Sequence, residues 1–250
     1  MAKLGSIMIN NSYKIAIRRL KSRNPNYALD DYCTLYTDAF WKLQYELFDC
    51  NFGTESLLKE KGSYIDEVVA CLLGGFGFKA EIGWAAFRRL KNRNLIKCGV
   101  DYSSLVNALL EPLKVGETWT HYRFPRQKSK YVYDFLCRKD LKCAPLENDR
   151  AFRSWLLTIN GIGPKTASWI TRNYFLSNNI AIIDIHIYRA GILTGFVSPE
   201  LDIHKNYFEI EQCFLNYCHS LKVKPSIMDM VMWLNMKKTN KIAISLINKN

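Results

Sequence analysis

Two glycines, a lysine and an aspartate are the residues of this 250-residue sequence best suited to chemistry. Gly161 and Gly163 are separated by one residue and stand between two stretches with helical patterns. Lys165 follows in the first turn of the second helix, and Asp184 opens the next helical stretch 19 residues later (184 − 165 = 19). An amine and a carboxylate can together break a glycosidic bond, so the segment suggests an enzyme that acts on DNA bases.

The two glycines predict a hairpin that presents backbone N–H groups to a phosphate. Glycine adopts positive φ without a Cβ penalty, so both positions suit a tight turn. Pro164 suits the first position of the following helix, where a missing N–H costs nothing. The start of that helix would then bind a DNA phosphate. A plain connection between two helices is the alternative, and the hairpin alone leaves both interpretations open.

Lys165 and Asp184 each have a structural interpretation and a chemical one. A lysine attacks only after it loses its proton, and burial near a helix N-terminus would lower the pKa of Lys165. Contact with a phosphate, or simple solvation at the surface, is the alternative for this side chain. Asp184 suits a helix N-cap. A carboxylate held there can also stabilise an oxocarbenium-like sugar or accept the proton of Lys165.

The charge of the chain favours a polyanionic partner. Its 35 Lys and Arg residues exceed its 23 Asp and Glu residues, which gives a formal net charge of +12 and a pI near 9.3. Such an excess favours nucleic acid through counterion release. Neither a run of eighteen apolar residues nor a signal-peptide core is found. We therefore expect no membrane partner and a cytoplasmic, nucleoid-associated protein.

The eight cysteines do not suggest a metal site. None of them forms a Cys-x-x-Cys pair, the close spacing that zinc and iron–sulfur sites usually contain. A disulfide framework is not expected in a chain of this length without an export signal. We therefore expect free, buried thiols and no metal ligands.

The spacing of apolar residues predicts a mostly helical chain with short connections. A helix is expected to end at Gly74-Gly75 and another to begin at the N-cap Asp101. The other expected helices cover about 29–49, 79–92, 126–138, 149–158, 164–176, 184–193, 203–220 and 226–237, with an extended segment at 115–124.

We expect four parts along the chain. A basic N-terminal segment, either a flexible arm or a short edge element, covers residues 1–28. An N-terminal helical lobe covers residues 29–120, and C-terminal helices could complete it. A catalytic lobe with the hairpin covers residues 121–238, and a tail covers residues 239–250.

The hairpin segment resembles a known family. Asn160-Gly-Ile-Gly-Pro-Lys-Thr-Ala-Ser168, followed by Ile183-Asp-Ile-His186, is similar to the helix-hairpin-helix DNA glycosylase superfamily, and more narrowly to its 8-oxoguanine DNA glycosylase branch. The resemblance covers roughly residues 65–238 and implies a mostly α, two-lobed helix-hairpin-helix fold with the active site in the cleft between the lobes. Three further stretches support it: Leu73-Gly-Gly-Phe-Gly-Phe-Lys-Ala-Glu-Ile-Gly83, Tyr122-Arg-Phe-Pro-Arg-Gln-Lys-Ser-Lys-Tyr131 and Ala167-Ser-Trp-Ile-Thr-Arg-Asn173.

The resemblance implies a bifunctional DNA glycosylase and AP lyase. Lys165 would displace the damaged base and hold the sugar as a Schiff base, and Asp184 would be its acid–base partner. An oxidised purine such as 8-oxoguanine is the expected base. The alternatives are another bulky modified base, including one in foreign DNA, a monofunctional enzyme in which water attacks, and a DNA-binding protein that cuts nothing. The endonuclease III type is disfavoured because only Cys213 and Cys218 follow Asp184.

The partner implied is double-stranded DNA with a damaged or modified base, bound by a monomer. No cofactor is required, although a monovalent cation at the hairpin carbonyls would match the family. We assign DNA binding to Gly161, Gly163, His186, Arg126 and Lys128, with phosphate contacts expected at the hairpin and at the basic residues 126 and 128.

Four residues are candidates for the pocket that holds an extruded base. Trp169 lies one turn beyond Lys165, where human-type relatives carry a small cysteine; core packing is its alternative. Phe76 lies in the glycine-rich loop and forms either a pocket wall or a packing contact. Asp229 would bind an N–H edge of the base or cap its helix, and Trp233 follows one turn later.

Overall fold

The computed structural model describes residues 11–23, 31, 34–52, 63–75, 77 and 79–248, and these form a mostly helical chain, as predicted. The chain divides into two compact units: residues 60–177 make one, and residues 1–59 together with 178–250 make the other. The border that we expected between residues 120 and 121 falls inside the first of these units. Residues 178–250 group with residues 1–59, whereas residues 60–120 of the expected N-terminal lobe belong to the other unit.

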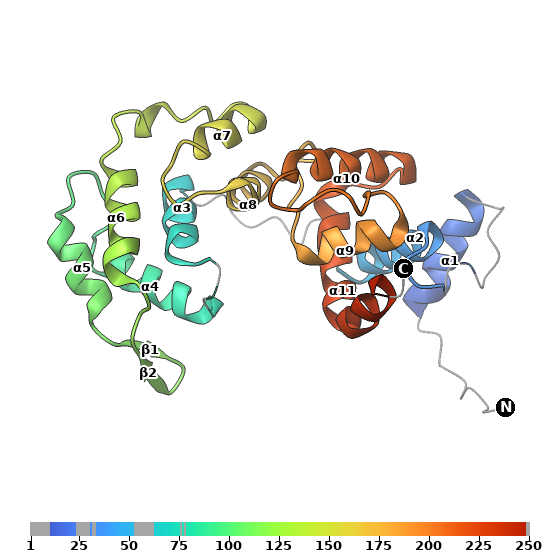
Figure 1. The fold of residues 1–250 in the computed structure, drawn as a ribbon, viewed down its shortest axis with the longest axis horizontal. Coiled ribbons are helices and arrows are strands. Elements are labelled where there is room, and N and C mark those ends of the chain that lie inside the picture. Colours follow the sequence, from blue (N-terminus) through green and yellow to red (C-terminus); the bar gives the residue numbers. More distant parts are fainter. Residues whose placement is uncertain are drawn as a thin grey trace. The chain divides into compact units, whose positions relative to one another are not determined.

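The unit of residues 60–177 contains most of the short helices and one β-hairpin (Figure 1). Side chains start three of the helices by accepting a backbone N–H: Ser63, Asp101 and Asn148. The two strands of the β-hairpin are antiparallel, and Lys114 lies directly opposite Trp119. The elements are α3 (Tyr64–Leu73), α4 (Ala80–Asn92), α5 (Tyr102–Leu110), β1 (Leu113–Val115), β2 (Thr118–Thr120), α6 (Pro125–Leu136), α7 (Asp149–Leu156) and α8 (Pro164–Phe175).

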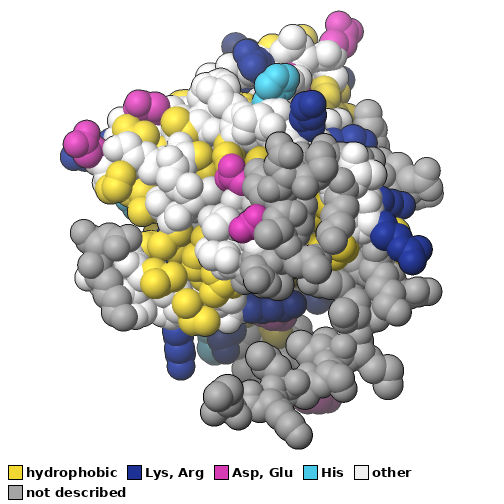
Figure 2. All heavy atoms as spheres, turned by 90° about the vertical axis from the view of Figure 1, so that its right-hand side faces the viewer, with side chains coloured by type: hydrophobic (Ala, Val, Ile, Leu, Met, Phe, Trp, Pro, Cys, Tyr) yellow, Lys and Arg dark blue, Asp and Glu magenta, His cyan; other side chains and the backbone are white. Residues whose placement is uncertain are grey.

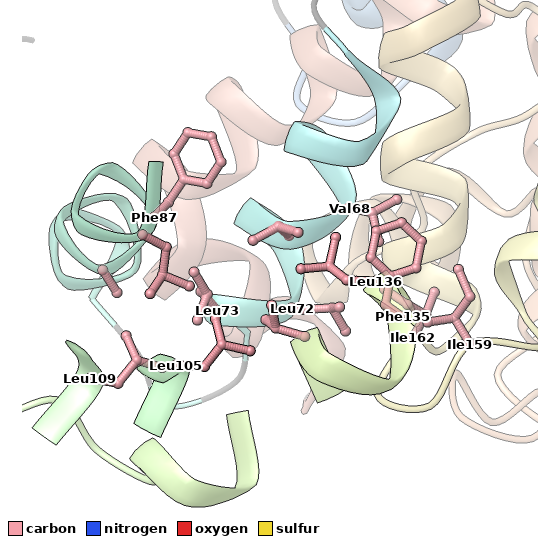
Figure 3. Close-up of a cluster of buried hydrophobic side chains, with 14 of the residues drawn as sticks. Val68, Leu72, Leu73, Phe87, Leu105, Leu109, Phe135, Leu136, Ile159 and Ile162 are labelled. Atoms are coloured by element: carbon pink, nitrogen blue, oxygen red, sulfur yellow. The ribbon is translucent and has the colours of Figure 1, made fainter. Parts of the chain in front are cut away.

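One apolar core holds this unit together, and the turn at Gly161 is anchored in it. Figure 3 shows Ile159 and Ile162, which flank Gly161, beside Phe135 and Leu136 of α6. All four side chains are buried. The hairpin is therefore fixed by burial on both sides of its turn, while the turn itself stays at the surface.

The other unit consists of α1 (Asn11–Arg23), α2 (Asp38–Phe52), α9 (Ile185–Thr194), α10 (Tyr207–Leu221) and α11 (Pro225–Ile247). Its largest fully buried side chain is Trp41, whose indole N–H donates to Thr194 Oγ1 at 2.9 Å. Phe214 and Met228 are also fully buried in the same cluster. This core carries the start of α9 and therefore Asp184.

Three predicted elements were wrong in extent or type. The basic N-terminal segment contains helix α1 rather than an arm or an edge element, because Ala16 and Leu20 pack against Ala39 and Leu43 of α2. Helix α2 begins at Asp38 instead of residue 29. The expected tail from residue 239 is helical as far as Ile247, because α11 continues and buries Ala243.

The surface shows both confirmed and corrected features. Among the described cysteines all are free, but Cys98, Cys137 and Cys143 are exposed, so the expectation of buried thiols was wrong for these three. None of the described helices has the length and apolar character to cross a membrane. On the face drawn in Figure 2, apolar side chains gather in one area while Lys and Arg lie mainly toward its margins. The basic side chains described on that face form no single strip.

Candidate active site

The hairpin is a tight turn closed by backbone hydrogen bonds. Ile159 donates its N–H to Leu156 at 3.0 Å, and Ile162 donates to Ile159 at 3.1 Å. Gly161 lies between them with φ +90°, a conformation that side-chain-bearing residues rarely adopt. The expected reason for glycine at position 161 is therefore confirmed.

Gly163 differs from Gly161, and the prediction of positive φ there was wrong. It is the N-cap of α8 with φ −98° and ψ 176°, an extended conformation that any residue adopts. A Cβ atom at this position would meet no heavy atom within 4 Å among the described residues. Neither strain nor crowding inside the chain requires glycine here, so its lack of a side chain leaves the helix start open to a ligand.

The start of α8 offers unbonded backbone donors. Pro164 occupies the first turn, as predicted, and no side chain caps the helix. No acceptor among the described residues reaches the N–H groups of Lys165 and Thr166, whereas Ala167 donates to Gly163 at 2.9 Å. Donors at a helix N-terminus attract an anion, so this geometry suits a phosphate group.

Lys165 and Trp169 lie on the exposed face of α8. Lys165 is exposed, so the burial expected of it is not found. Trp169, four residues later, has 45% of its surface exposed, and the alternative that it packs in the core is wrong. An amine and an aromatic ring one helical turn apart are thus both accessible. This arrangement would allow the amine to reach a sugar and the ring to contact a base.

Asp184 is the N-cap of α9. Its Oδ1 accepts the backbone N–H groups of His186 at 2.8 Å and Ile187 at 3.0 Å. The side chain is buried, with 9% of the residue exposed. Its second oxygen, Oδ2, meets no hydrogen-bond donor in the described part of the chain. Oδ1 therefore holds the carboxylate in place, and Oδ2 remains available to exchange a proton with a ligand.

Three polar side chains hold the buried segment that leads to Asp184. Glu211 accepts the N–H of Ala181 at 2.9 Å, and the Tyr207 hydroxyl accepts that of Ile183 at 3.1 Å. Asp229 accepts the N–H of Ile182 at 3.5 Å. An extended segment without strand partners needs such acceptors when it is buried.

Asp229 is therefore not where we expected it. With only 2% of its surface exposed it does not offer its carboxylate to a base, and it does not cap α11, which begins after Lys224. Glu211 was missed by sequence reasoning. A signal existed, because Tyr207, Ile210, Glu211 and Phe214 share one face of α10 and the acid interrupts an otherwise apolar stripe.

Trp233 and His186, which we expected to contact the DNA, are more accessible than Asp229. Trp233 is 38% exposed, with the ammonium of Lys237 4.8 Å from its ring centroid. The ring of His186 is half-buried, and its Nδ1 is buried without a hydrogen-bond partner among the described residues. Phe76 lies outside the described residues.

The two cations of α6 that we assigned to phosphate binding, Arg126 and Lys128, differ from each other. Arg126 is exposed and makes no side-chain hydrogen bond to any described residue. Lys128 instead donates to the carbonyl oxygens of Leu72 and Gly74, both at 2.7 Å, and burial lowers its pKa. The assignment of Lys128 to phosphate is therefore corrected: its ammonium caps the C-terminal end of α3.

Phe124 has a backbone conformation that sequence reasoning missed. It lies directly before α6 with φ 61° and ψ 47°, a left-handed conformation that is costly for a large residue. Its ring is 48% exposed, and the Arg123 guanidinium lies 4.7 Å from the ring centroid. A strained, exposed aromatic ring beside a cation is typical of a surface that contacts a ligand.

The described residues form no metal site of the usual kind. No group of three or more His, Cys, Asp or Glu side chains among the described residues could hold a metal ion. The carbonyl oxygens of Gly161 and Ile162 accept no hydrogen bond from a described donor. Carbonyl oxygens are ligands that a hard cation accepts, so the hairpin suits a monovalent cation in its donor chemistry.

Comparisons with known proteins point to one family. The model of the 8-oxoguanine DNA glycosylase family matches residues 51–223, more than half of the chain. The chain is 30% identical over 167 residues to an 8-oxoguanine DNA glycosylase/AP lyase of Fusobacterium nucleatum, covering 62% of this chain and 71% of that protein. It is 33% identical over 134 residues to the protein of the same description from Saccharolobus solfataricus, covering 48% and 61%.

Solved structures show the same fold. The 8-oxoguanine DNA glycosylase of Thermotoga maritima matches with a TM-score of 0.51 and 20% identity, over 90% of this chain and 95% of that one. The Methanocaldococcus jannaschii 8-oxoguanine glycosylase/lyase, in complex with a 15-mer DNA containing 8-oxoguanine, matches with a TM-score of 0.53 and 23% identity, over 90% and 96%. With the family model covering both the hairpin and Asp184, the chain belongs to the 8-oxoguanine DNA glycosylase family.

Proposed function

We propose that the protein is a DNA glycosylase and AP lyase that excises 8-oxoguanine from double-stranded DNA. The observation that carries the proposal is the exposed amine of Lys165 in the first turn of α8, beside backbone donors that no described residue uses. The relatives from Fusobacterium nucleatum and Saccharolobus solfataricus, described as 8-oxoguanine DNA glycosylase/AP lyases, support the choice of reaction.

In the first step Lys165 is the nucleophile. Its amine gives up a proton, and the nitrogen lone pair forms a bond to the anomeric carbon of the damaged nucleotide. The glycosidic bond breaks, its electron pair leaves on the base nitrogen, and that nitrogen takes up a proton. We assign the proton transfer to Asp184, whose Oδ2 meets no described donor.

In the second step the sugar ring opens and the lysine nitrogen forms a Schiff base with the former anomeric carbon. Loss of a proton from C2′ then expels the 3′ phosphate, which cuts the strand by β-elimination. Water hydrolyses the Schiff base and releases Lys165. The Asp184 carboxylate also stabilises positive charge on the sugar while the base leaves, because two backbone hydrogen bonds hold the carboxylate in place.

The DNA contacts follow from the unbonded donors and cations. The N–H groups of Lys165 and Thr166 would bind a phosphate across the open side of Gly163. Arg126 and the ring of His186 would supply further phosphate contacts. We propose that one monomer binds one duplex.

The exposed aromatic rings are the candidates for holding the extruded base. Trp169 and Trp233 are both exposed indoles on rigid helices, and base stacking on an aromatic ring is worth about 1–3 kcal/mol. A monovalent cation, when bound by the carbonyls of Gly161 and Ile162, would add positive charge beside the phosphate.

The test is mass spectrometry of the bases released from duplexes that each carry one modified base, with gel analysis of the strands. We expect release of 8-oxoguanine together with strand cleavage, and no release from the same duplex with guanine. Release without cleavage would indicate a monofunctional enzyme in which water attacks. Release of a different modified base would refute the substrate, and salt-sensitive binding without any release would indicate a non-catalytic DNA-binding protein.

A further inference from the structure

A group of cationic side chains, apart from the start of α8, lies in the unit of residues 60–177. There the last turns of α4 pack against strand β1 (Figure 1). A pocket of about 300 Å³ opens there, and four of the side chains that line it are cations: Arg88, Arg89, Arg93 and Lys114. We call it the arginine pocket. The assignments made from the sequence to catalysis, phosphate binding and the base pocket include none of its residues.

Two of the four cations already have partners. Arg89 donates to the carbonyl oxygens of Ala108, Glu111 and Pro112 at 3.2, 2.7 and 2.5 Å, which ties α4 to the end of α5. Arg93 binds both carboxylate oxygens of Glu111, at 2.8 and 2.5 Å, and this bond lowers the pKa of Glu111. Glu111 therefore offsets the charge of Arg89 and Arg93, with which it forms ion pairs at 4.0 and 2.5 Å.

The other two cations, Arg88 and Lys114, are exposed and make no side-chain hydrogen bond or ion pair with any described residue. A cation near the end of a helix is stabilised by the helix dipole, which accounts for Arg88 in part. Lys114 comes from a strand, where that explanation does not apply. Like charges brought to one pocket repel one another, and a bound anion removes the repulsion.

An exposed indole lies beside the pocket. Trp119 is the direct cross-strand partner of Lys114, so the two side chains project from the same face of the β-hairpin. With 66% of its surface exposed, Trp119 is the most exposed large apolar side chain among the described residues. A flat aromatic ring beside a lysine that pairs with no described side chain is a combination that nucleic-acid surfaces use.

We propose that the arginine pocket binds a backbone phosphate of the duplex, through Arg88 and Lys114, with Trp119 against the adjoining sugar. The inference rests on the proposed function in one respect, namely that DNA is the bound partner. Arg89 and Arg93 keep the pocket in shape through their bonds to residues 108–112. A guanidinium and an ammonium suit one phosphodiester, since the first binds two oxygens in a plane and the second acts as a point charge.

The experiment measures binding to an undamaged duplex as a function of salt concentration, so that it does not depend on base excision. The double variant Arg88→Ala/Lys114→Ala is compared with Lys139→Ala/Lys142→Ala, which removes the same charge from exposed lysines outside the pocket. For one lost phosphate contact, the slope of log K against log salt falls in magnitude by about 1. The control pair is expected to leave the slope unchanged.

Two further arms make the outcome decisive. Trp119→Ala is expected to weaken binding several-fold without changing the slope. Equal slopes in the two double variants would overturn the inference. So would tight, Arg88-dependent binding of inorganic phosphate that DNA does not displace, because the pocket would then serve a free anion.

Thermal unfolding of each variant shows whether it is folded, and Lys114→Gln alone, on an exposed strand position, provides a second variant. The two proposals fail in different ways. If the protein excises no base but the salt slope of DNA binding falls in the double variant, the proposed function is refuted and phosphate binding by the arginine pocket is supported. If excision is normal and the salt slope is unchanged in the double variant, the proposed function is supported and phosphate binding by the arginine pocket is refuted.

Discussion

The ring of Tyr131 lies against Gly161 so closely that a Cβ atom at position 161 would be 2.7 Å from Cδ2 of the ring. Real Cβ atoms do not approach a neighbour this closely, so the contact requires glycine. Because Tyr131 belongs to α6, it joins that helix to the hairpin. The exposed Arg126 on the same helix is therefore held in a fixed relation to the start of α8.

Gly161→Ala should destabilise the protein. The substitution forces a Cβ into the Tyr131 ring and places alanine at φ +90°, and the backbone term alone costs about 1–2 kcal/mol. Urea unfolding monitored by circular dichroism measures the loss. Gly163→Ala is the matched control, because its φ of −98° and open surroundings accept a methyl group.

The control carries its own expectation. Gly163→Ala should keep wild-type stability within about 0.5 kcal/mol while weakening DNA binding, since the methyl group stands at the start of α8 where the phosphate would approach. Equal DNA affinity in wild type and Gly163→Ala would show that no phosphate approaches there.

Asp184→Asn should separate the structural role of this residue from the chemical one. Asparagine is as good an N-cap as aspartate, so the bonds from His186 and Ile187 are kept and stability should hardly change. Turnover should fall by two orders of magnitude or more in single-turnover kinetics, because an amide cannot take a proton. Asp184→Ala should also lose about 1 kcal/mol of stability. Normal turnover in the asparagine variant would contradict the proposed mechanism.

The lowered pKa of Asp140 predicts that the stability of the protein falls as the solution becomes acidic. Hydrogen bonds from Arg138 and from the Trp155 indole lower its pKa from 3.8 to about 2. A depressed carboxyl pKa contributes stability that is present above pH 4 and is lost as the pH falls toward 2. Asp140→Asn should therefore be less stable than wild type at neutral pH, and the difference should shrink over that window. Urea midpoints at several pH values measure it, and a difference that is constant with pH would argue against this account.

Lys128 and Arg126 should behave differently although both are cations on α6. Lys128→Met removes two hydrogen bonds from the end of α3, and we expect a loss of about 1–3 kcal/mol of stability. Arg126→Ala should leave stability unchanged and lower the salt slope of DNA binding by about 1. Thermal unfolding and filter binding distinguish them, and the reverse pattern would restore Lys128 as a phosphate contact.

Local features of the site were predictable from the sequence. The N-caps Asp101 and Asp184, the stop at Gly74 and Pro164 at the start of α8 all follow from backbone chemistry within a few residues. The family resemblance follows from the hairpin motif. These predictions succeeded because the physical cause lies in neighbouring residues.

Features that depend on distant contacts were not predictable. Asp229 and Lys128 look like surface groups in the sequence, yet backbone groups 47 and 56 residues away bind them. The helix α1 depends on apolar packing against α2, which a basic sequence conceals. The positive φ was wrongly assigned to Gly163 because a Gly-x-Gly pattern does not say which glycine makes the turn.

The central claim is that Lys165 forms a covalent bond to the sugar. Borohydride reduction during reaction with a duplex containing 8-oxoguanine traps such a Schiff base, and peptide mapping by mass spectrometry identifies the modified residue. We predict an adduct on Lys165 that is absent in Lys165→Gln and present in the control Lys142→Gln, an exposed lysine of the same unit. An adduct of equal yield in Lys165→Gln, or base release without any adduct in the wild type, would contradict the account.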